Sequence, residues 1–217
     1  MKFLVVAAWE PELAAFRTRA GTMAAGDVVM ETMGVGLVEA AIAMTRCVER
    51  HRPSAALLLG TCGAFALPIG TVVTASKVHL ACGGITDGAA ALPAPMPATA
   101  SFDEELHAAL VAAGAKSVQI ANTLGITIDD ALASRLAASG GVEHLEAFAF
   151  ARACAAAGGT AIPCAVVLGV ANVVGARGRA EWLANQDSAS AKAADVAYKA
   201  MAAMTKIAMV KRPTKAP

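Results

Sequence analysis

The chain has 217 residues, of which 57% are hydrophobic and 16% are charged, and this composition predicts a folded domain and excludes an intrinsically disordered chain. The net charge of +1 gives no sign of the basic surface that nucleic-acid-binding proteins carry. The mildly basic tail, Lys206 to Lys215, is typical of a solvated terminus. We therefore expect one soluble domain over residues 1–217 that binds no nucleic acid.

Strands and helices are predicted to alternate along the chain. Buried apolar runs of strand length are found at residues 3–8, 27–33, 55–60, 71–83, 117–123 and 161–170. Helical patterns occupy residues 11–20, about 37–50, 103–113, 129–138, 146–157 and 188–209. Residues 61–64 and the proline-rich residues 88–100 are interpreted as loops. This alternation predicts a single α/β domain with a central mixed, mainly parallel sheet flanked by helices.

The sequence favours neither a membrane protein nor a metalloprotein. The uncharged stretch Ser54–Ser76 is long enough to raise the membrane question, but its glycines and its proline divide it into two buried strands and a loop. The apolar run that starts at Phe3 meets Glu10 at once, unlike a signal peptide. The five cysteines occur singly, with no CxxC pair, and the zinc-binding pattern HExxH does not occur. We therefore expect a cytoplasmic protein with reduced thiols, no metal and no cofactor.

Four polar segments follow predicted strands, where open α/β sheets bind their ligands. They are Trp9–Glu12, Gly60–Ala64, Val142–Glu146 and Gly169–Asn172, the last continuing to Arg179. Each also has a purely structural explanation: acidic residues that complement a helix dipole, a tight turn, a solvated helix cap and a turn-forming asparagine. On these residues alone, both interpretations stay open.

The residue types in these segments still suggest specific chemistry. Glu143 and Glu146 are three residues apart and could share a helix face, where a carboxylate could bind a pair of sugar hydroxyls. Asn172 offers both a donor and an acceptor to the edge of a base. Cys62 could be a nucleophile, but no histidine has a spacing that suggests a partner. The Gly34-Val35-Gly36 turn lacks the full GxGxxG pattern, so phosphate cradling is weakly supported.

Taken in order, the segments resemble the purine nucleoside phosphorylase/nucleosidase superfamily, and the futalosine hydrolases most closely. The matching stretches are MKFLVVAAWEPEL, GVGLVEAA, LLLGTCGAFALPIGTVVTAS, NTLGIT with VEHLEAFAFARAC, and VANVVGARGRAEW, which together span nearly the whole chain. The chain departs from the family pattern at three positions, with Leu145 for methionine, Leu168 for arginine and Ala171 for serine.

The resemblance implies roles for eight residues. Glu12 corresponds to the carboxylate that activates water, and Asn172 to the catalytic residue on the base side. The ribose and base contacts implied are Glu146, Leu145, Thr61, Cys62, Gly63 and Ile126. The phosphate-binding GDPxR turn of the hexameric phosphorylases is replaced by Glu10-Pro11-Glu12, which favours water over phosphate because a carboxylate repels phosphate.

The expected activity is thus hydrolysis of the N-glycosidic bond of a purine nucleoside, futalosine-like or another 6-oxopurine nucleoside. The amide of Asn172 suits a 6-oxopurine, whereas the adenine-specific nucleosidases carry aspartate at this position. Three alternatives stay open: a phosphate-dependent phosphorylase, a methylthioadenosine/adenosylhomocysteine nucleosidase and a non-catalytic nucleoside-binding homologue. The expected partners are a small nucleoside and, by resemblance, further copies of the chain in a homodimer or larger oligomer.

Overall fold

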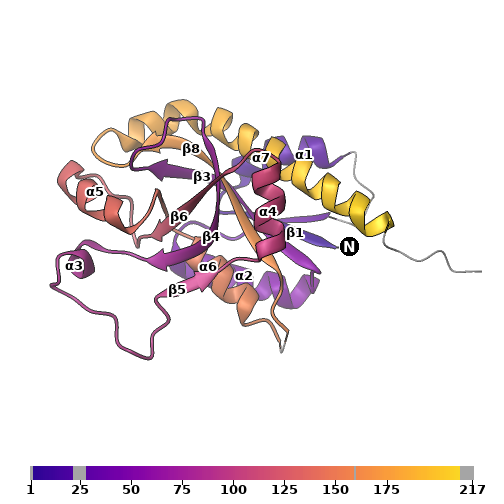
Figure 1. Ribbon diagram of the computed structural model, residues 1–217, viewed down its shortest axis with the longest axis horizontal. Coiled ribbons are helices and arrows are strands. Elements are labelled where there is room, and N and C mark those ends of the chain that lie inside the picture. The colour runs from indigo at the N-terminus through magenta and orange to yellow at the C-terminus, as the bar shows by residue number, and fades with distance from the viewer. Residues whose placement is uncertain (1, 22–27, 159, 211–217) are drawn as a thin grey trace, which may run out of the picture.

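Eight strands form one mixed sheet at the centre of the molecule (Figure 1). This computed structural model describes residues 2–21, 28–158 and 160–210, and the side chains only as far as residue 205. The strands are β1 (Phe3–Ala7), β2 (Val28–Thr32), β3 (Ala55–Ala64), β4 (Val72–Leu80), β5 (Thr99–Ser101), β6 (Lys116–Asn122), β7 (Val142–His144) and β8 (Cys164–Val173).

The sheet closes partly on itself. β2, β1 and β3 are parallel neighbours, and β3 pairs with β8 along nearly its whole length and with β7 at its last two residues. β8 pairs with β4, β4 with β6, and β6 with β7, so these strands and β3 form a closed ring. The short strand β5 lies on β4 outside the ring. The pairing of β3 with β8 shifts register between Cys62 and Gly63, and the two residues after the shift pair with both β8 and β7.

Helices cover both faces of the sheet. One apolar core lies beneath α2 (Leu37–His51) and α6 (Ala147–Ala155) and includes Met44 and Phe150. The other lies beneath α1 (Ala14–Ala20), α4 (Glu104–Ala112) and α7 (Gly178–Val210) and includes Phe16 and Leu110. The remaining helical segments are η1 (Glu10–Leu13), α3 (Gly83–Thr86), α5 (Asp130–Leu136) and η2 (Ala137–Ser139).

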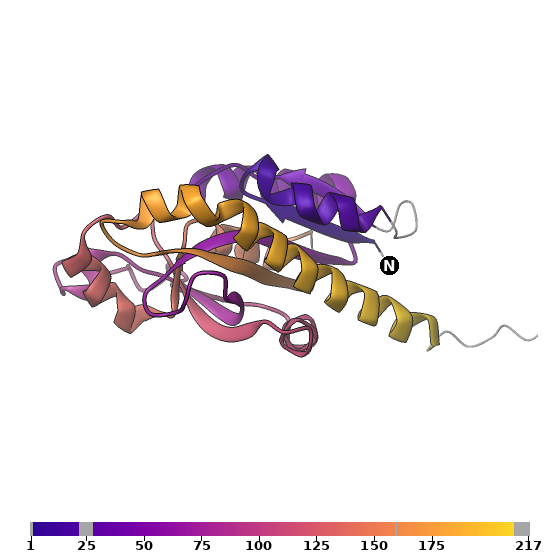
Figure 2. The same cartoon turned by 90° about the horizontal axis from the view of Figure 1, so that it is seen from above.

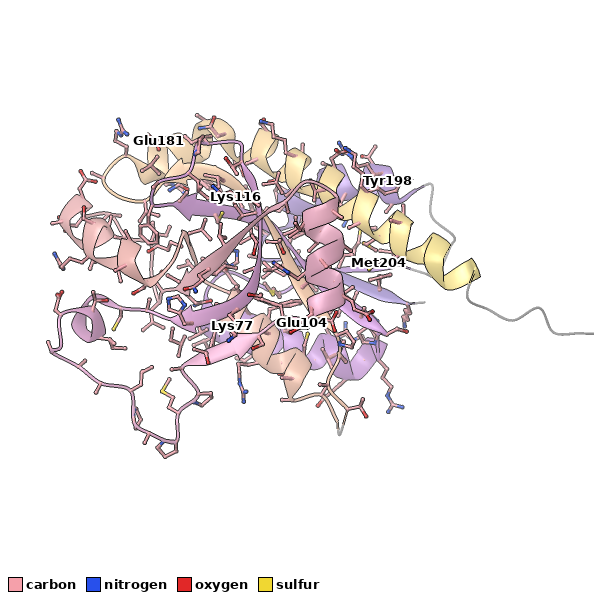
Figure 3. All side chains as sticks on the ribbon, viewed as in Figure 1. Lys77, Glu104, Lys116, Glu181, Tyr198 and Met204 are labelled. Atoms are coloured by element: carbon pink, nitrogen blue, oxygen red, sulfur yellow. The ribbon has the colours of Figure 1, made fainter. Side chains whose placement is uncertain are left out.

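The long helix α7 lies close against β8. Figure 2 shows it running the length of one face of the molecule, and Figure 3 marks Glu181 near its start and Met204 near its far end. Alanines such as Ala193 and Ala197 form its buried face. At Gly169 of β8, an added Cβ would lie 2.2 Å from the carbonyl oxygen of Ala189. Glycine and alanine therefore allow the backbones of helix and strand to approach closely.

The predicted fold class is confirmed: the sheet is mixed, mainly parallel and flanked by helices. Several predicted boundaries are wrong. Residues 61–64 continue β3 instead of forming a loop, and residues 142–144 form strand β7. β8 starts at Cys164, not at residue 161, and continues through Asn172. Each of these stretches is held by pairing with a distant strand, which local sequence does not reveal.

Helix α7 starts ten residues before the predicted residue 188. Its first turns direct Trp182, Leu183 and Gln186 toward a cavity instead of the core, so the apolar stripe that marks a buried helix is missing there. The short strand β5 occupies the end of the predicted loop 88–100. Asp27, the expected start of the second strand, lies outside the described residues, as does most of the basic tail, residues 211–217.

Among the described residues, no helix is both long enough and apolar enough to cross a membrane. The stretch Ser54–Ser76 instead contains β3 and the first half of β4, as the sequence predicted. All five cysteines are free thiols, and all but Cys82 are buried.

Candidate active site

A cavity of about 440 Å³ lies beside the carboxyl ends of β1, β3 and β8. Strand β7 and the first turns of α7 complete its walls. All eight residues singled out by sequence line this one cavity: Glu12, Thr61, Cys62, Gly63, Ile126, Leu145, Glu146 and Asn172. The chain thus brings residues 160 positions apart into one site, while their chemical roles stay predictions.

Glu12 is a buried carboxylate held by Thr61. It lies in η1, the short helix after β1, which begins with Glu10-Pro11. Both the backbone N–H and the hydroxyl of Thr61 donate to Glu12 Oε1, each at 2.8 Å. Burial raises the pKa of Glu12 to about 7, against the opposing effect of these hydrogen bonds and with a further increase from the charge of Glu146. The group is therefore poised to exchange a proton near neutral pH.

Gly60 on β3 packs directly against the Glu12 carboxylate, where a larger residue would not fit. A Cβ on Gly60 would lie 3.2 Å from both carboxylate oxygens of Glu12. Cys62 follows two residues later and is also buried. Burial, and then the charge of Glu12, raise the pKa of the Cys62 thiol far above its usual range, so this thiol stays protonated and is a poor nucleophile.

Glu146 is anchored at the N-terminus of α6, where it occupies the cap position. Its Oε1 accepts a hydrogen bond of 2.7 Å from the backbone N–H of Gly36. This contact explains the Gly34-Val35-Gly36 turn, whose two glycines have φ of 78° and 94°: it presents an N–H to a carboxylate instead of cradling a phosphate. The second carboxylate oxygen, Oε2, remains for a ligand such as a pair of hydroxyls.

His144 lies beside Glu146 but does not form an ion pair with it. Although Glu146 Oε2 is 3.2 Å from Nδ1 of His144, Nδ1 already accepts from the backbone N–H groups of Glu146 and Ala147, each at 3.1 Å. Burial lowers the pKa of His144 despite the neighbouring carboxylates. The ring is therefore neutral at pH 7 and carries its proton on Nε2.

Glu143 does not share a helix face with Glu146, contrary to the sequence prediction. Glu143 belongs to strand β7, and Glu146 comes after that strand has ended. The Glu143 carboxylate is buried and accepts hydrogen bonds from the backbone N–H and the hydroxyl of Thr127. It also lines the cavity, so three carboxylates border the same space.

Asn172 is fixed between two glycines inside β8, not in a turn after it. A Cβ on Gly63 would lie 2.9 Å from Asn172 Nδ2, and one on Gly178 would lie 3.0 Å from it. Nδ2 donates to the carbonyl oxygen of Val173 at 3.0 Å. One of the two N–H donors of this amide is therefore engaged within the protein. The departures Leu168 and Ala171 are fully buried in β8.

Two tryptophans and an arginine lie at another part of the wall. The rings of Trp9 and Trp182 are 5.7 Å apart, and the Arg179 guanidinium lies 5.2 Å from the centre of the Trp182 ring. The indole Nε1–H of Trp182 donates to the Thr61 hydroxyl at 3.1 Å. The sequence analysis included Arg179 and Trp182 in its matching segments but gave them no role, although the spacing of the α7 residues that line the cavity is helical: Arg179, Trp182, Leu183 and Gln186.

Asn122, at the end of β6, was also missed, and it holds the Glu146 segment in place. Its Nδ2 donates to the carbonyl oxygen of Leu145, and its Oδ1 accepts from the backbone N–H of Phe148, both at 2.9 Å. The side chain is almost completely buried. It thus connects the sheet to the first turn of α6, on either side of Glu146.

The chain is similar to known proteins over nearly its full length. A family model described as the phosphorylase superfamily matches residues 4–206. The 5′-methylthioadenosine/S-adenosylhomocysteine nucleosidases of Shewanella sp. strain MR-7 and Shewanella oneidensis are 35% and 36% identical to this chain over 96 residues. These matches cover 36% of this chain and 41% of each relative, so the match spans about two fifths of the length of these curated relatives.

Solved structures share the fold. The futalosine hydrolase of Helicobacter pylori strain 26695 superposes with a TM-score of 0.82 at 13% identity, covering 94% of this chain and 98% of the other. The 5′-methylthioadenosine/S-adenosylhomocysteine nucleosidase of Colwellia psychrerythraea 34H, solved with adenine, has a TM-score of 0.80 at 20% identity, covering 93% and 95%. At these identities the likeness establishes the fold.

Proposed function

This chain belongs to the phosphorylase superfamily, and we propose that it hydrolyses the N-glycosidic bond of a purine nucleoside to the free base and the sugar. The observation that carries the proposal is the buried Glu12 carboxyl, whose pKa of about 7 lies in the range of a general base. It shares its cavity with Glu146 and Asn172. The nucleosidases among the chain's relatives support the same activity.

The proposed reaction divides the work among these three side chains. The bond between C1′ and the base nitrogen lengthens to give an oxocarbenium-like sugar, as in glycoside hydrolysis. Glu12 accepts a proton from the attacking water. Glu146, with Oε2 not engaged by Gly36, binds the ribose hydroxyls. Asn172 donates a hydrogen bond to the leaving base and stabilises the negative charge that develops on it. The departing purine anion takes a proton from solvent, and Glu12 releases the proton it took from water to solvent, so the products are the neutral base and the sugar.

Water is favoured over phosphate by the charges around the cavity. The carboxyl groups of Glu12, Glu143 and Glu146 all line it, whereas Arg179 is the one cationic side chain among its described lining residues. His144 is neutral. A phosphate dianion placed near Glu12 would be repelled by these carboxylates, and a neutral water molecule would not.

We propose a 6-oxopurine nucleoside, such as a futalosine-like compound, as the substrate. The remaining N–H of Asn172 suits O6 or N7 of such a base, because both atoms are acceptors. A second candidate is a 6-aminopurine nucleoside of the methylthioadenosine type. It is favoured by the Asn172 Oδ1 atom, which accepts no hydrogen bond from the described residues and could accept one from an exocyclic amine.

The proposal is tested by incubating the protein with inosine, futalosine, methylthioadenosine and adenosylhomocysteine, with and without phosphate, and measuring free base. We expect phosphate-independent release of base, greatest for a 6-oxopurine nucleoside. Glu12→Gln should lower kcat by about 10²–10⁴-fold and change nucleoside affinity by only a few-fold. Glu10→Gln is the matched control, because Glu10 is exposed and paired with Arg17.

Other outcomes would identify the alternatives. Release of base that requires phosphate would indicate a phosphorylase. Preference for methylthioadenosine would assign the second candidate substrate. Nucleoside binding without any release of base would indicate a non-catalytic binding protein. Full turnover by the Glu12→Gln variant would remove Glu12 from the mechanism.

A further inference from the structure

Trp182 is connected to Glu12 through a continuous chain of hydrogen bonds. The indole Nε1–H donates to Thr61 Oγ1 at 3.1 Å, and Oγ1 donates to Glu12 Oε1 at 2.8 Å. The three side chains come from α7, β3 and η1, which are far apart in sequence. Thr61 and Glu12 are buried and Trp182 is half-buried, so the chain of hydrogen bonds is largely shielded from water.

The direction of each hydrogen bond follows from chemistry. An indole N–H is only a donor, so Thr61 Oγ1 must be the acceptor in its bond to Trp182. A threonine hydroxyl has one proton and can rotate, so it could point elsewhere if nothing occupied its lone pairs. With the indole proton on one side, the hydroxyl proton is directed to the carboxylate. Hydrogen bonds in such a series also polarise and strengthen one another.

The Trp182 ring is itself held in place. Trp9 packs against it with ring centres 5.7 Å apart, and the Arg179 guanidinium lies over its face. A cation over an indole face draws electron density toward itself and makes the N–H a better donor. The ring is thus oriented by Trp9, which directly precedes η1, and by Arg179 on α7.

We propose that Trp182 is a positioning residue for Glu12, which it orients and stabilises in the ionised form through the Thr61 hydroxyl. The catalytic part of this inference rests on the proposed function, in which ionised Glu12 activates water. Trp182 was not among the residues that the sequence pattern assigned, and its indole N–H gives it a role beyond lining the cavity.

The other charged groups around Glu12 act in different ways. Glu146, at the start of α6, raises the pKa of Glu12 by repulsion between the two carboxylates. Cys62 on β3 stays a neutral thiol. On η1 and α1, Glu10 and Arg17 pair with each other at the surface. On α7, Arg179 lies over the Trp182 ring, and Glu181 is paired with Arg177 and the Val173 N–H.

The decisive experiment compares Trp182→Phe with the wild type. Phenylalanine retains an aromatic ring but lacks the N–H, so the ionised form of Glu12 loses support and its pKa rises further. Since the pKa of Glu12 is about 7, we expect the acid limb of the pH profile of kcat/KM near pH 7 in the wild type, and it should move upward by roughly half a pH unit in the variant. Isotope-edited infrared spectroscopy of the Glu12 carboxyl, assigned with Glu12→Gln, should show the same upward shift without any substrate.

Two further variants separate this role from packing. Thr61→Val removes the hydroxyl and should raise the pKa of Glu12 by more than Trp182→Phe does. Adding Trp182→Phe to Thr61→Val should change nothing further, because the connection is already broken. Trp9→Phe alters the same ring pair but not the N–H to Thr61, so it should leave the Glu12 titration in place.

An unchanged Glu12 titration in Trp182→Phe would overturn the inference, and so would an equal shift in Trp9→Phe or an additive shift in the double variant. If Trp182→Phe does not fold, Thr61→Val and Thr61→Ser decide, since serine should restore the titration and valine should not. If no nucleoside is hydrolysed at all, the proposed function fails. The infrared titration still tests the link between Trp182 and Glu12 in that case.

Discussion

At the scale of single residues, burial of Glu12 lowers the free energy of unfolding at neutral pH. Its pKa rises from 4.5 to about 7 on burial, so between these pH values the folded state binds a proton that the unfolded state has released. Stability therefore falls as pH rises from about 4.5 to about 7 and stays low above it. The full cost, about 3 kcal/mol, follows from the pKa difference, and it is the counterpart of holding a base ready at neutral pH.

Glu12→Gln should therefore stabilise the protein while it abolishes turnover. Glutamine can still accept the Thr61 hydrogen bonds through its carbonyl oxygen, but it cannot ionise. We expect a free energy of unfolding up to about 3 kcal/mol higher than that of the wild type at pH 8, with the difference shrinking to near zero at pH 4.5. Urea unfolding at several pH values measures it. Glu10→Gln, the exposed control, should show no such trend, and a Glu12→Gln variant that is less stable at pH 8 would contradict the burial argument.

How far the site could be predicted depended on where each residue lies in sequence. Glu12, Glu146 and Asn172 stood out because each is a polar residue at the end of an apolar strand or the start of a helix. Trp182 and Asn122 did not, because their importance comes from hydrogen bonds to distant parts of the chain. The partner of Trp182 is 121 positions away, and the partners of Asn122 are about 25 positions away. The hydrogen bond from Asn172 to Val173 O could not be predicted for the same reason, because it depends on the packed position of the amide.

At the scale of elements, the alternation of strands and helices was predictable, but the ends of the central strands were not. The extensions of β3 and β8 pair with each other, and that of β3 also pairs with β7, whose three residues carry too short a pattern to be detected. The ring of strands follows from these pairings, and none of them is local. The apolar pattern therefore predicted the sheet but not its closure.

The close approach of α7 to β8 gives a prediction at this scale. Gly169→Ala places a methyl group where the backbone carbonyl of Ala189 already lies, at 2.2 Å from the new Cβ. A backbone atom cannot move aside as a side chain can, so the helix must shift. We expect a loss of about 1–3 kcal/mol or more in the free energy of unfolding, measured by thermal or urea unfolding.

Gly125→Ala is the control for this variant. Its added Cβ would meet no atom within 4 Å and its φ is not positive, so its stability should stay near that of the wild type. Equal stability of the Gly169→Ala and wild-type proteins would show that α7 is not packed against β8 as closely as described. Because the first turns of α7 carry Trp182 and Arg179, displacement of this helix should also weaken nucleoside binding.

At the scale of the whole molecule, the outer face of α2 carries an unusual apolar stripe. Its buried face packs into the core through Ala40 and Met44, yet Val38 and Ile42, on the opposite side, are 66% and 46% exposed. Val35, just before the helix, is exposed as well and lines the cavity. Apolar residues at helical spacing on an exposed surface are typical of a protein interface.

We therefore predict that the protein forms a homodimer or larger oligomer through this face of α2, as the family resemblance implied. Light scattering coupled to gel filtration should give at least twice the mass of the chain, 21.8 kDa. Val38→Glu places a charge in the centre of the stripe, where burial without a partner is costly, and should yield monomers. Val111→Glu on α4, whose valine is 41% exposed, is the matched control and should leave the assembly intact.

A wild-type monomer, or a Val38→Glu variant that still assembles, would exclude α2 as the interface. Because Val35 joins the stripe to the cavity, loss of the assembly should also raise KM.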